Sequence, residues 1–335
     1  MSLYHAKHAK SDDHDDPSAT LLAVALIRSR EAIVGTEVLT ATAPPTQPAP
    51  GIARLPAELR LPVLRQELTE GLTVTASAGQ AELACQGGPL VTITAPEAQA
   101  LSDAVEMVGH YAELRADRLA EIEVQRGPLI PFFAAIHPLE PARDAATLEA
   151  LACALEVATP LIMRLKLALA CPRPAELSPG IQPMIASPGH PAYPSGHATQ
   201  AFCLAALLTR LINPAAPFRA RDPLFLLAAR IAVNRTVAGV HYPVDSAAGA
   251  VLGLQIAEWL WARGQQGASL QGAGFDGEKW MDGTRPRDFH PGTLEVLMGW
   301  GDLAASRGDP FTPPQAPLWS DLLGRAREER EAALR

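Results

Sequence analysis

Apolar residues recur at helical spacing through most of the second half of the chain, in long segments rich in Ala and Leu. Segments of this kind form helices that bury much of their surface, and short connections between them favour a bundle. The sequence therefore predicts a mainly α fold with a helical-bundle core. Its four central helices are expected over residues 145–170, 197–211, 224–237 and 246–263, with further helices over 97–126 and 294–305 and at the charged C-terminal end.

A two-residue period appears before the bundle. Residues 72–75 and 90–94 are β-like runs on either side of a Gly-containing stretch, which predicts a small β-hairpin in the N-terminal region. Residues 40–51 are Pro-rich and indicate a linker or an extended surface segment. These patterns divide the chain into a flexible polar arm (1–18), an N-terminal extension with the hairpin (19–95), the bundle core (96–265) and a C-terminal extension packed on the core (266–335).

Charge and composition exclude several classes of protein. The net charge of -8 argues against a general nucleic-acid binder, because that role needs a basic surface. No apolar segment followed by a cleavage site begins the chain, and the apolar stretches 224–240 and 246–262 are broken by polar or charged residues. We therefore expect a cytoplasmic protein without membrane association.

Cysteines and N-terminal histidines give little support for a metal site. The four cysteines are scattered without a C-x-x-C pair, which indicates buried reduced thiols and not zinc ligands or disulfides. His5, His8 and His14 lie in the polar arm, where solvated side chains are the expected state and metal binding is the alternative.

Three short motifs between Lys166 and Asp245 carry side chains suited to an oxyanion. The first motif is Lys166 followed by Arg173, which has a proline on either side. A lysine supplies a point charge, and the planar arginine fork matches two oxygens of a tetrahedral anion. A lysine and an arginine near a helix end also serve as solvated or capping groups, so this motif is weak by itself.

The second motif runs from His190 to His197 and includes Ser195 and Gly196. Ser195 occupies an N-cap position before an apolar helix, and the free amides of the first turn form an anion site. His197 stands at the helix start, where it can act as an acid or a base on a bound anion. An ordinary serine N-cap with a surface histidine is the alternative for this motif alone.

The third motif places Arg235 at the end of one helix, His241 in the next connection and Asp245 at the following helix start. Asp245 either caps that helix or orients a nearby histidine ring through its second nitrogen. Burying an arginine and a histidine between apolar helices is costly without an anionic partner. Together the three motifs, on successive helices, predict one oxyanion pocket.

K-x6-R-P, P-S-G-H and R-x5-H-x3-D resemble the signature of the type-2 phosphatidic acid phosphatase and vanadium haloperoxidase superfamily. Asn234 stands where that family usually has Ser before the third-motif arginine. The resemblance implies the helical bundle of this family, with 96–265 as the catalytic core. It also implies that the bound anion, vanadate or phosphate, is held by Lys166, Arg173, Ser195, Gly196 and Arg235. In this family's arrangement His241 would bond to the central atom of the anion and would be oriented by Asp245. His197 would be the acid/base group.

Two activities are implied by this resemblance. Vanadate is stable in the five-coordinate geometry that phosphate reaches only during phosphoryl transfer. One pocket can therefore serve both activities. His190 lies five residues before Ser195, as in the bromoperoxidase branch, and implies a vanadate-dependent haloperoxidase that oxidises bromide or iodide with hydrogen peroxide. The short chain and the compact spacing from Ser195 to Arg235 resemble the phosphatases, and imply a soluble phosphomonoesterase that works through a phosphohistidine at His241.

A third hypothesis is a catalytically silent phosphate-binding or assembly subunit, against which the complete set of polar side chains argues. The expected partners are small anions (halide, vanadate or phosphate) and hydrogen peroxide. The apolar bundle and the long terminal extensions lead us to expect a homo-oligomer.

Overall fold

The computed structural model describes residues 21, 23–28, 51–282, 287–301 and 304–333, and divides into two compact units. In the first unit, Met1–Glu58, residues 21 and 23–28 are helical, and a 3-10 turn, η1, spans Gly51–Arg54. The predicted polar arm with its three histidines and nearly all of the Pro-rich segment 40–51 lie outside the described residues. The second unit, Leu59–Arg335, holds the remaining elements, apart from the first two residues of α3 (Ala57–Thr69).

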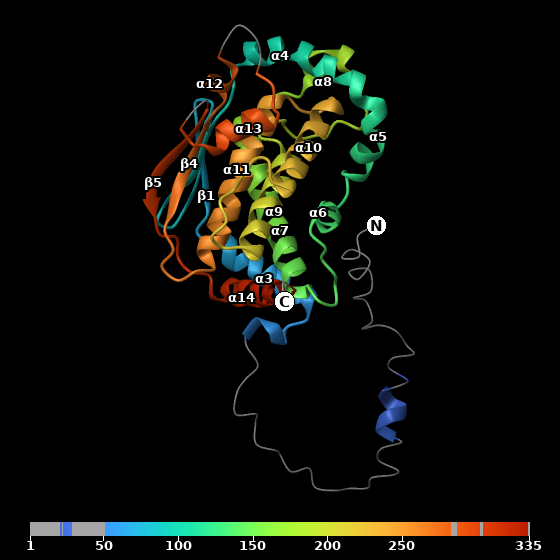
Figure 1. Cartoon of the computed structure of the whole chain (residues 1–335), viewed down its shortest axis with the longest axis vertical. Coiled ribbons are helices and arrows are strands. Elements are labelled where there is room, and N and C mark those ends of the chain that lie inside the picture. The colour runs from blue at the N-terminus through green and yellow to red at the C-terminus, as the bar shows by residue number, and fades with distance from the viewer. Residues whose placement is uncertain (1–20, 22, 29–50, 283–286, 302–303, 334–335) are drawn as a thin grey trace. The chain divides into compact units, whose positions relative to one another are not determined.

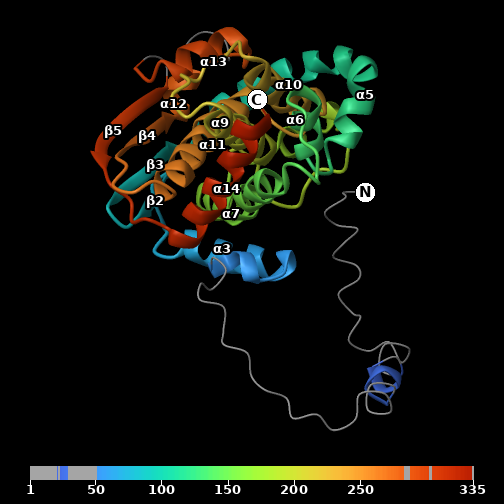
Figure 2. The same ribbon diagram turned by 60° about the horizontal axis from the view of Figure 1, so that its bottom comes forward.

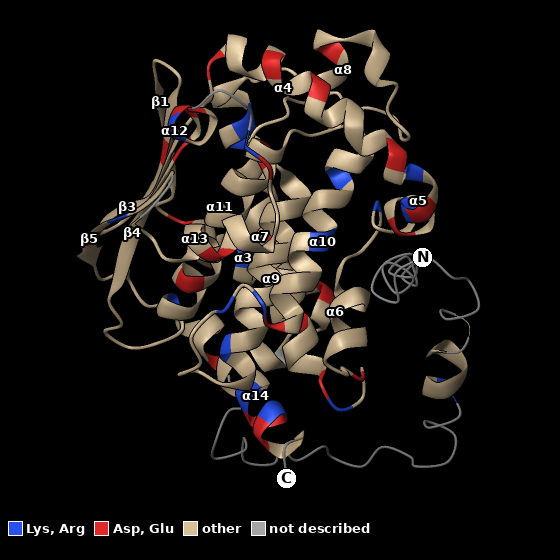
Figure 3. Cartoon of the chain, turned by 45° about the horizontal axis from the view of Figure 1, so that its top comes forward, with Lys and Arg blue, Asp and Glu red and all other residues tan. Residues whose placement is uncertain are grey.

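Four apolar helices form the centre of the second unit, as the sequence predicts. They lie side by side in Figures 1 and 2, and nearly every residue of the last of them is buried. Figure 3 shows charged residues mainly on peripheral elements, while the central helices are largely uncharged. The four helices are α7 (Ala145–Leu169), α9 (Gly196–Ile212), α10 (Pro223–Val237) and α11 (Pro243–Arg263).

Helices α9 and α11 pack with their backbones close together. A Cβ atom on Gly249 of α11 would lie 2.7 Å from the carbonyl oxygen of Ser195, and one on Gly253 would lie 3.0 Å from the amide nitrogen of Cys203. Only a residue without a side chain permits this approach. The two glycines, one helical turn apart, therefore bring the N-terminal end of α9 against the first turns of α11.

A five-stranded sheet replaces the predicted hairpin and covers one flank of the bundle (Figure 1). The antiparallel order β1, β2, β3 is extended by β4, which is parallel to β3, and by the antiparallel edge strand β5. The strands are β1 (Thr73–Ser77), β2 (Gln80–Cys85), β3 (Gly88–Thr94), β4 (Leu270–Asp276) and β5 (Ala305–Phe311).

The hairpin prediction is wrong in extent, because the stretch between the two β-like runs is itself β2 and two further strands come from the C-terminal region. Strand β4 contains two glycines and β5 contains Gly and Pro, which lowers their intrinsic β propensity. Pairing with buried β3 compensates for this. The helix predicted over 294–305 is observed as α13 (Pro291–Met298), and Ala305 begins β5.

The helix predicted over 97–126 is divided into α4 (Ala98–His110), the 3-10 turn η2 (Tyr111–Leu114) and α5 (Arg115–Val124). Helix α5 packs on α10, where Glu121 accepts hydrogen bonds from Arg230 at 2.5 and 2.7 Å. The remaining short elements are α6 (Ile130–Ile136), α8 (Pro174–Leu177), η3 (Pro179–Ile181) and α12 (Gly277–Met281).

The last helix, α14 (Pro317–Ala333), packs across α7 and α9. Its Glu329 carboxylate accepts hydrogen bonds from the amides of Ala146 and Thr147 at 2.8 Å, and so caps the N-terminal end of α7. The indole Nε1 of Trp319 donates to the carbonyl of Leu260 in α11 at 2.7 Å. These bonds attach the C-terminal residues to the bundle.

Within the described part of the chain, one helical stretch, Ala145–Leu177, is long and apolar enough to cross a membrane by length and composition. It contains α7, and 61% of its most apolar window is buried inside the protein. Core helices pass the same test, so this stretch is weak evidence for a membrane span.

Candidate functional site

The bundle brings the three motifs together at one set of helix ends. Lys166 lies in the last turn of α7, and Ala170 ends that helix in the left-handed conformation, with φ of 50°. The chain then reaches Arg173, the N-cap residue of α8. Ser195 is the N-cap residue of α9, and Asp245 lies in the first turn of α11. The amide of Ser195 donates to the carbonyl of Asp245 at 2.9 Å, so the second and third motifs are in direct contact.

Arg173 joins the first motif to the other two. Its Nη1 donates to the carbonyl of Val240 at 2.7 Å, next to His241. Its Nε donates to the carbonyls of Pro188 and His190 at 3.1 and 3.0 Å. The side chain is 1% exposed, and burial lowers its pKa because the charged form loses hydration.

Lys166 is fully buried and is held by main-chain oxygens. Its Nζ donates to the carbonyls of Pro191 and Ala192 at 2.9 and 2.5 Å. These two bonds leave one of its three ammonium protons for another acceptor. Burial lowers the pKa of Lys166 and raises that of Asp245, since each charged form is removed from water.

Arg235 is a buried guanidinium with unused donors. Its Nη2 donates to the carbonyl of Ile122 at 3.2 Å and to Oε1 of Gln125 at 3.3 Å. Its Nε and Nη1 are buried without a hydrogen-bond partner among the described residues. Burial lowers the pKa of Arg235 to about 10, and the charge of Arg126 adds to this effect. A buried charged group with three free N–H donors on two nitrogens is costly unless a ligand completes it.

His241 and Asp245 form the closest polar pair of the site. Nδ1 of His241 lies 2.7 Å from Oδ2 of Asp245, which also accepts from the amide of Tyr242 at 3.1 Å. The carboxylate therefore fixes the ring proton on Nδ1 and leaves the lone pair on Nε2. Burial, followed by the charges of Lys166 and Arg173, lowers the pKa of His241 well below its usual value.

His197 is anchored outside its own motif. Its Nε2 lies 3.0 Å from the carbonyl oxygen of Gln125, and a carbonyl can only accept, so this nitrogen carries the proton. Burial, with the charge of Arg235 as the second cause, lowers the pKa of His197 to about 4. The ring is therefore neutral near pH 7 while no anion is bound.

The start of α9 supplies main-chain donors as predicted. The Ser195 hydroxyl accepts from the amide of Ala198 at 3.4 Å, which is the expected N-cap bond. The amides of Gly196 and His197 have no acceptor within the described part of the chain. A Cβ atom on Gly196 would meet only Ile162, at 3.7 Å, so packing does not require glycine there.

His190 lies against the first motif. Its Nδ1 is 3.1 Å from Nη2 of Arg173 and 3.1 Å from the carbonyl of Pro191. A lone pair on Nδ1 accepts from Arg173, whereas a proton on Nδ1 donates to Pro191, so the tautomer of the ring decides which of the two bonds forms. Burial lowers the pKa of His190, and Lys166 and Arg173 add to this effect. His190 therefore lies in contact with one cation of the first motif.

Two supporting residues could not be assigned from the sequence. Gln125 lies near the end of the helix predicted over 97–126, with no motif around it, yet it contacts Arg235 and His197. Asn234 was noted only as a replacement for Ser, and its Nδ2 donates to Gln125 at 2.9 Å and to Glu121 at 3.1 Å. No local sequence signal indicates that α5 lies over the end of α10.

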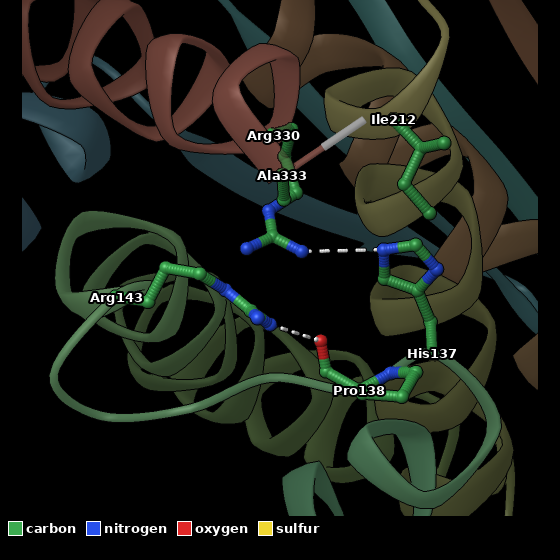
Figure 4. Close-up of a pocket in the computed structure, with 6 residues that line it drawn as sticks. All are labelled: His137, Pro138, Arg143, Ile212, Arg330 and Ala333. Carbon is green, nitrogen blue, oxygen red and sulfur yellow. Dashed lines mark hydrogen bonds between the residues drawn. The ribbon is translucent and has the colours of Figure 1, made fainter. Parts of the chain in front are cut away.

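A cavity of about 230 Å³ lies away from these residues and does not contain the predicted site. In Figure 4 the guanidinium groups of Arg143 and Arg330 face it, with Arg143 bonded to the carbonyl of Pro138 and Arg330 to His137. The buried carboxylate of Asp144 pairs with both arginines. Because these contacts join α14 to the residues before α7, we interpret the cavity lining as a structural network that holds α14 to the start of α7.

The described residues contain no group of three or more His, Cys, Asp and Glu side chains suited to a metal cation. The four cysteines are free; Cys153, Cys171 and Cys203 are buried as the sequence predicts, whereas Cys85 is only partly buried. The site instead combines Lys166, Arg173 and Arg235 with the single carboxylate of Asp245. This excess of positive charge fits an anion.

Comparison with known proteins supports the superfamily for the centre of the chain. Residues 146–267 match the PAP2 superfamily, which includes vanadium haloperoxidases and phosphatases and whose members are typically enzymes. The matched segment begins in α7, ends after α11 and contains all three motifs. No curated protein matches the chain.

Proposed function

We propose that the pocket formed by the three motifs binds a tetrahedral or five-coordinate oxyanion. The observation that carries this proposal is the buried guanidinium of Arg235, whose Nε and Nη1 have no partner in the described structure. Lys166 and the amides of Gly196 and His197 add further free donors nearby. Several donors and three cations around one carboxylate suit vanadate or phosphate, whose oxygens accept from each of them.

As the specific activity we propose a vanadate-dependent haloperoxidase that oxidises halide, with bromide or iodide favoured, at the expense of hydrogen peroxide. Bound vanadate supplies the centre at which peroxide is activated for oxygen transfer to halide. The contact between His190 and Arg173 supports this choice, because it puts a second histidine beside the residues that would hold vanadate. His241, with its lone pair on Nε2, would be the side chain that binds vanadium.

The remaining residues would control charge and protons. Lys166, Arg173 and Arg235 neutralise the anion oxygens, and Asp245 holds the His241 ring in one tautomer. An anion in the pocket opposes the effect of Arg235 on His197 and raises the pKa of that ring. His197 can then take up a proton and return it within the turnover.

A second candidate is a phosphomonoesterase, favoured by the compact spacing of the motifs from Ser195 to Arg235. In that reaction Nε2 of His241 forms a bond to phosphorus while the bond to the alcohol oxygen breaks, and protonated His197 donates to the leaving oxygen. Water then attacks the phosphohistidine, gives a proton to His197 and releases phosphate and His241. The same residues serve both reactions.

A paired assay tests these proposals. The full-length protein, freed of anions and incubated with orthovanadate, should brominate an activated organic acceptor when bromide and peroxide are added. Hydrolysis of a chromogenic phosphate ester should be absent or should be inhibited by vanadate. Inhibition of ester hydrolysis without bromination would reject the haloperoxidase and support the phosphatase. Failure of the protein to bind either vanadate or phosphate would reject the oxyanion pocket.

A further inference from the structure

Gln125 lies at a point where two site residues from different helices meet. It is the C-cap residue of α5 and is 1% exposed. Its side-chain Oε1 accepts from Nη2 of Arg235 at 3.3 Å, and its main-chain oxygen accepts from Nε2 of His197 at 3.0 Å. One residue outside the three motifs therefore contacts a cation of the pocket and its acid/base histidine.

The contact with Arg235 determines which donors remain available. Gln125 and the carbonyl of Ile122 both bind Nη2, while Nε and Nη1 are left without partners in the described structure. Because a guanidinium is planar, fixing Nη2 at two acceptors fixes the direction of the other donors. The neutral amide of Gln125 fixes these directions and leaves the positive charge of Arg235 intact. A carboxylate in the same place would neutralise that charge.

The contact with His197 determines its tautomer. A carbonyl oxygen only accepts, so the bond to Gln125 keeps the ring proton on Nε2 and the lone pair on Nδ1. Nδ1 has no hydrogen-bond partner among the described residues, so it is the nitrogen left for proton exchange.

Gln125 is itself held by the packing of α5 on α10. Nδ2 of Asn234 donates to Oε1 of Gln125 at 2.9 Å and to Oε2 of Glu121 at 3.1 Å, and Arg118 donates to Oδ1 of Asn234 at 3.3 Å. Arg230 binds the same Glu121 carboxylate. These bonds hold the end of α5 over the end of α10, which keeps both acceptors of Gln125 in place.

We propose that Gln125 is a positioning residue that sets the direction of the free Arg235 donors and the tautomer of His197. Any effect of Gln125 on turnover rests on the proposed function of the oxyanion site. The positioning of Arg235 and His197 by Gln125 is a property of the protein without a bound anion. This distinction allows the two proposals to be tested separately.

The test uses three variants of the full chain. Gln125→Met keeps the length of the side chain and removes the acceptor, and Gln125→Glu keeps the acceptor and adds a negative charge beside Arg235. The matched control is Gln255→Met, because Gln255 is also buried and its Oε1 accepts from Arg307 at 3.0 Å, away from the site. Orthovanadate binding is measured by calorimetry, stability by thermal melting, and the empty proteins by 15N NMR of the histidine rings and arginine guanidinium groups.

Both methionine variants should melt at lower temperature than the parent, because each leaves an arginine donor without its acceptor. Of these two methionine variants, Gln125→Met should raise the Kd for orthovanadate by about tenfold, as expected for loss of one hydrogen bond to a charged group, and Gln255→Met should leave it unchanged. Gln125→Glu should also weaken binding, since its carboxylate neutralises Arg235. In the empty parent, NMR should show the His197 proton on Nε2 and restricted rotation of the Arg235 guanidinium, and Gln125→Met should release that rotation.

Gln125 would be only a structural residue if Gln125→Met lost as much stability as Gln255→Met but kept the Kd for orthovanadate and the Arg235 spectrum of the parent. A His197 proton on Nδ1 in the parent would overturn the tautomer assignment. If the parent binds no orthovanadate or phosphate, the proposed function fails, while the two NMR readouts still decide whether Gln125 positions Arg235 and His197.

Discussion

Nδ1 of His241 lies 2.7 Å from Oδ2 of Asp245, in a buried pair that connects the loop after α10 to the first turn of α11. The main-chain oxygen of Asp245 also accepts a hydrogen bond from the amide of Ser195, at 2.9 Å. One residue therefore orients the histidine through its side chain and fixes the start of α9 through its backbone. A change limited to the carboxylate should separate these two roles.

Asp245→Asn should reduce turnover far more than anion binding. The amide oxygen can still accept from His241 and Tyr242, so the site should remain assembled, but the charge that makes Nε2 more basic is lost. We expect turnover to fall about 10- to 100-fold, as for other residues that orient a ligating histidine. Steady-state kinetics and calorimetry with orthovanadate measure the two effects, with the surface substitution Asp103→Asn as the control. Equal losses in binding and turnover would contradict this division.

Arg235→Met should abolish tight anion binding without harming the empty protein. The substitution removes a buried charge whose Nε and Nη1 lack partners among the described residues, so the free energy of unfolding of the empty protein should fall by no more than about 1 kcal/mol. The Kd for orthovanadate should rise by about 100-fold, because several charge-assisted hydrogen bonds are lost. Urea unfolding and calorimetry measure these quantities.

The matched control for that variant is Arg221→Met. The side chain of Arg221 is 71% exposed and pairs with Glu295, and it takes no part in the bonds that hold α5 on α10. It should bind orthovanadate like the parent. A large loss of stability in the empty Arg235→Met protein would contradict this prediction, because it would mean that the guanidinium stabilises the fold without a bound anion.

Acid should destabilise the empty protein through its buried histidines. In the unfolded chain a histidine takes up a proton below its ordinary pKa of 6.5, whereas folded His197 does so only near 4. At His197 the folded state therefore binds fewer protons in this interval, so this residue lowers the free energy of unfolding as the pH decreases from 6.5 to 4, whereas Asp245, whose pKa burial raises, acts in the opposite direction. His197→Gln should make this decrease smaller. Urea unfolding across the interval measures it.

His110→Gln is the control for the pH experiment, because the side chain of His110 is 76% exposed. It should show the same dependence on pH as the parent. An identical dependence in His197→Gln and the parent would mean that His197 is not buried in its neutral form.

Gly249→Ala should disturb the site from a distance. The added Cβ would lie 2.7 Å from the carbonyl oxygen of Ser195 and 2.8 Å from Cβ of Ala198, so α9 must move away from α11. We expect a loss of about 1–3 kcal/mol in the free energy of unfolding, as for overpacking, together with weaker orthovanadate binding. Gly324→Ala, on an exposed turn of α14 with open space around it, should stabilise by about 0.5–1 kcal/mol. Unchanged binding in Gly249→Ala would show that the site tolerates this shift.

His190→Ala tests the proposed halide chemistry. His190 contacts only one donor of Arg173, which keeps its bonds to several main-chain oxygens, so the Kd for orthovanadate should change by less than about threefold. The rate of bromide oxidation, or its dependence on pH, should change clearly. Bromination assays from pH 5 to 8 measure this. Equal loss of binding and oxidation would make His190 a structural residue.

Local sequence patterns determined the central helices and the chemistry of the motifs. The helix predicted over 145–170 is observed at Ala145–Leu169, and Ser195 caps α9 as its position before an apolar run indicates. These features depend on periodicity and capping, which act over a few residues and can be read from the chain. The positions of the motifs relative to the predicted helices likewise indicated that the site residues lie near helix ends, namely Lys166, Arg173, His197 and His241.

The tertiary structure alone decided the features that depend on distant segments. Strands β4 and β5 have weak propensity of their own and form because β3 offers a partner, so the sheet was predicted only as a hairpin. The role of Gln125 follows from the packing of α5 on α10, across more than a hundred residues of sequence. Such contacts leave no periodic signal, because burial and hydrogen-bond geometry are set by the fold. The sequence by itself therefore identified the candidate site residues of the three motifs, and the tertiary structure decided how Arg235 and His197 are held among them.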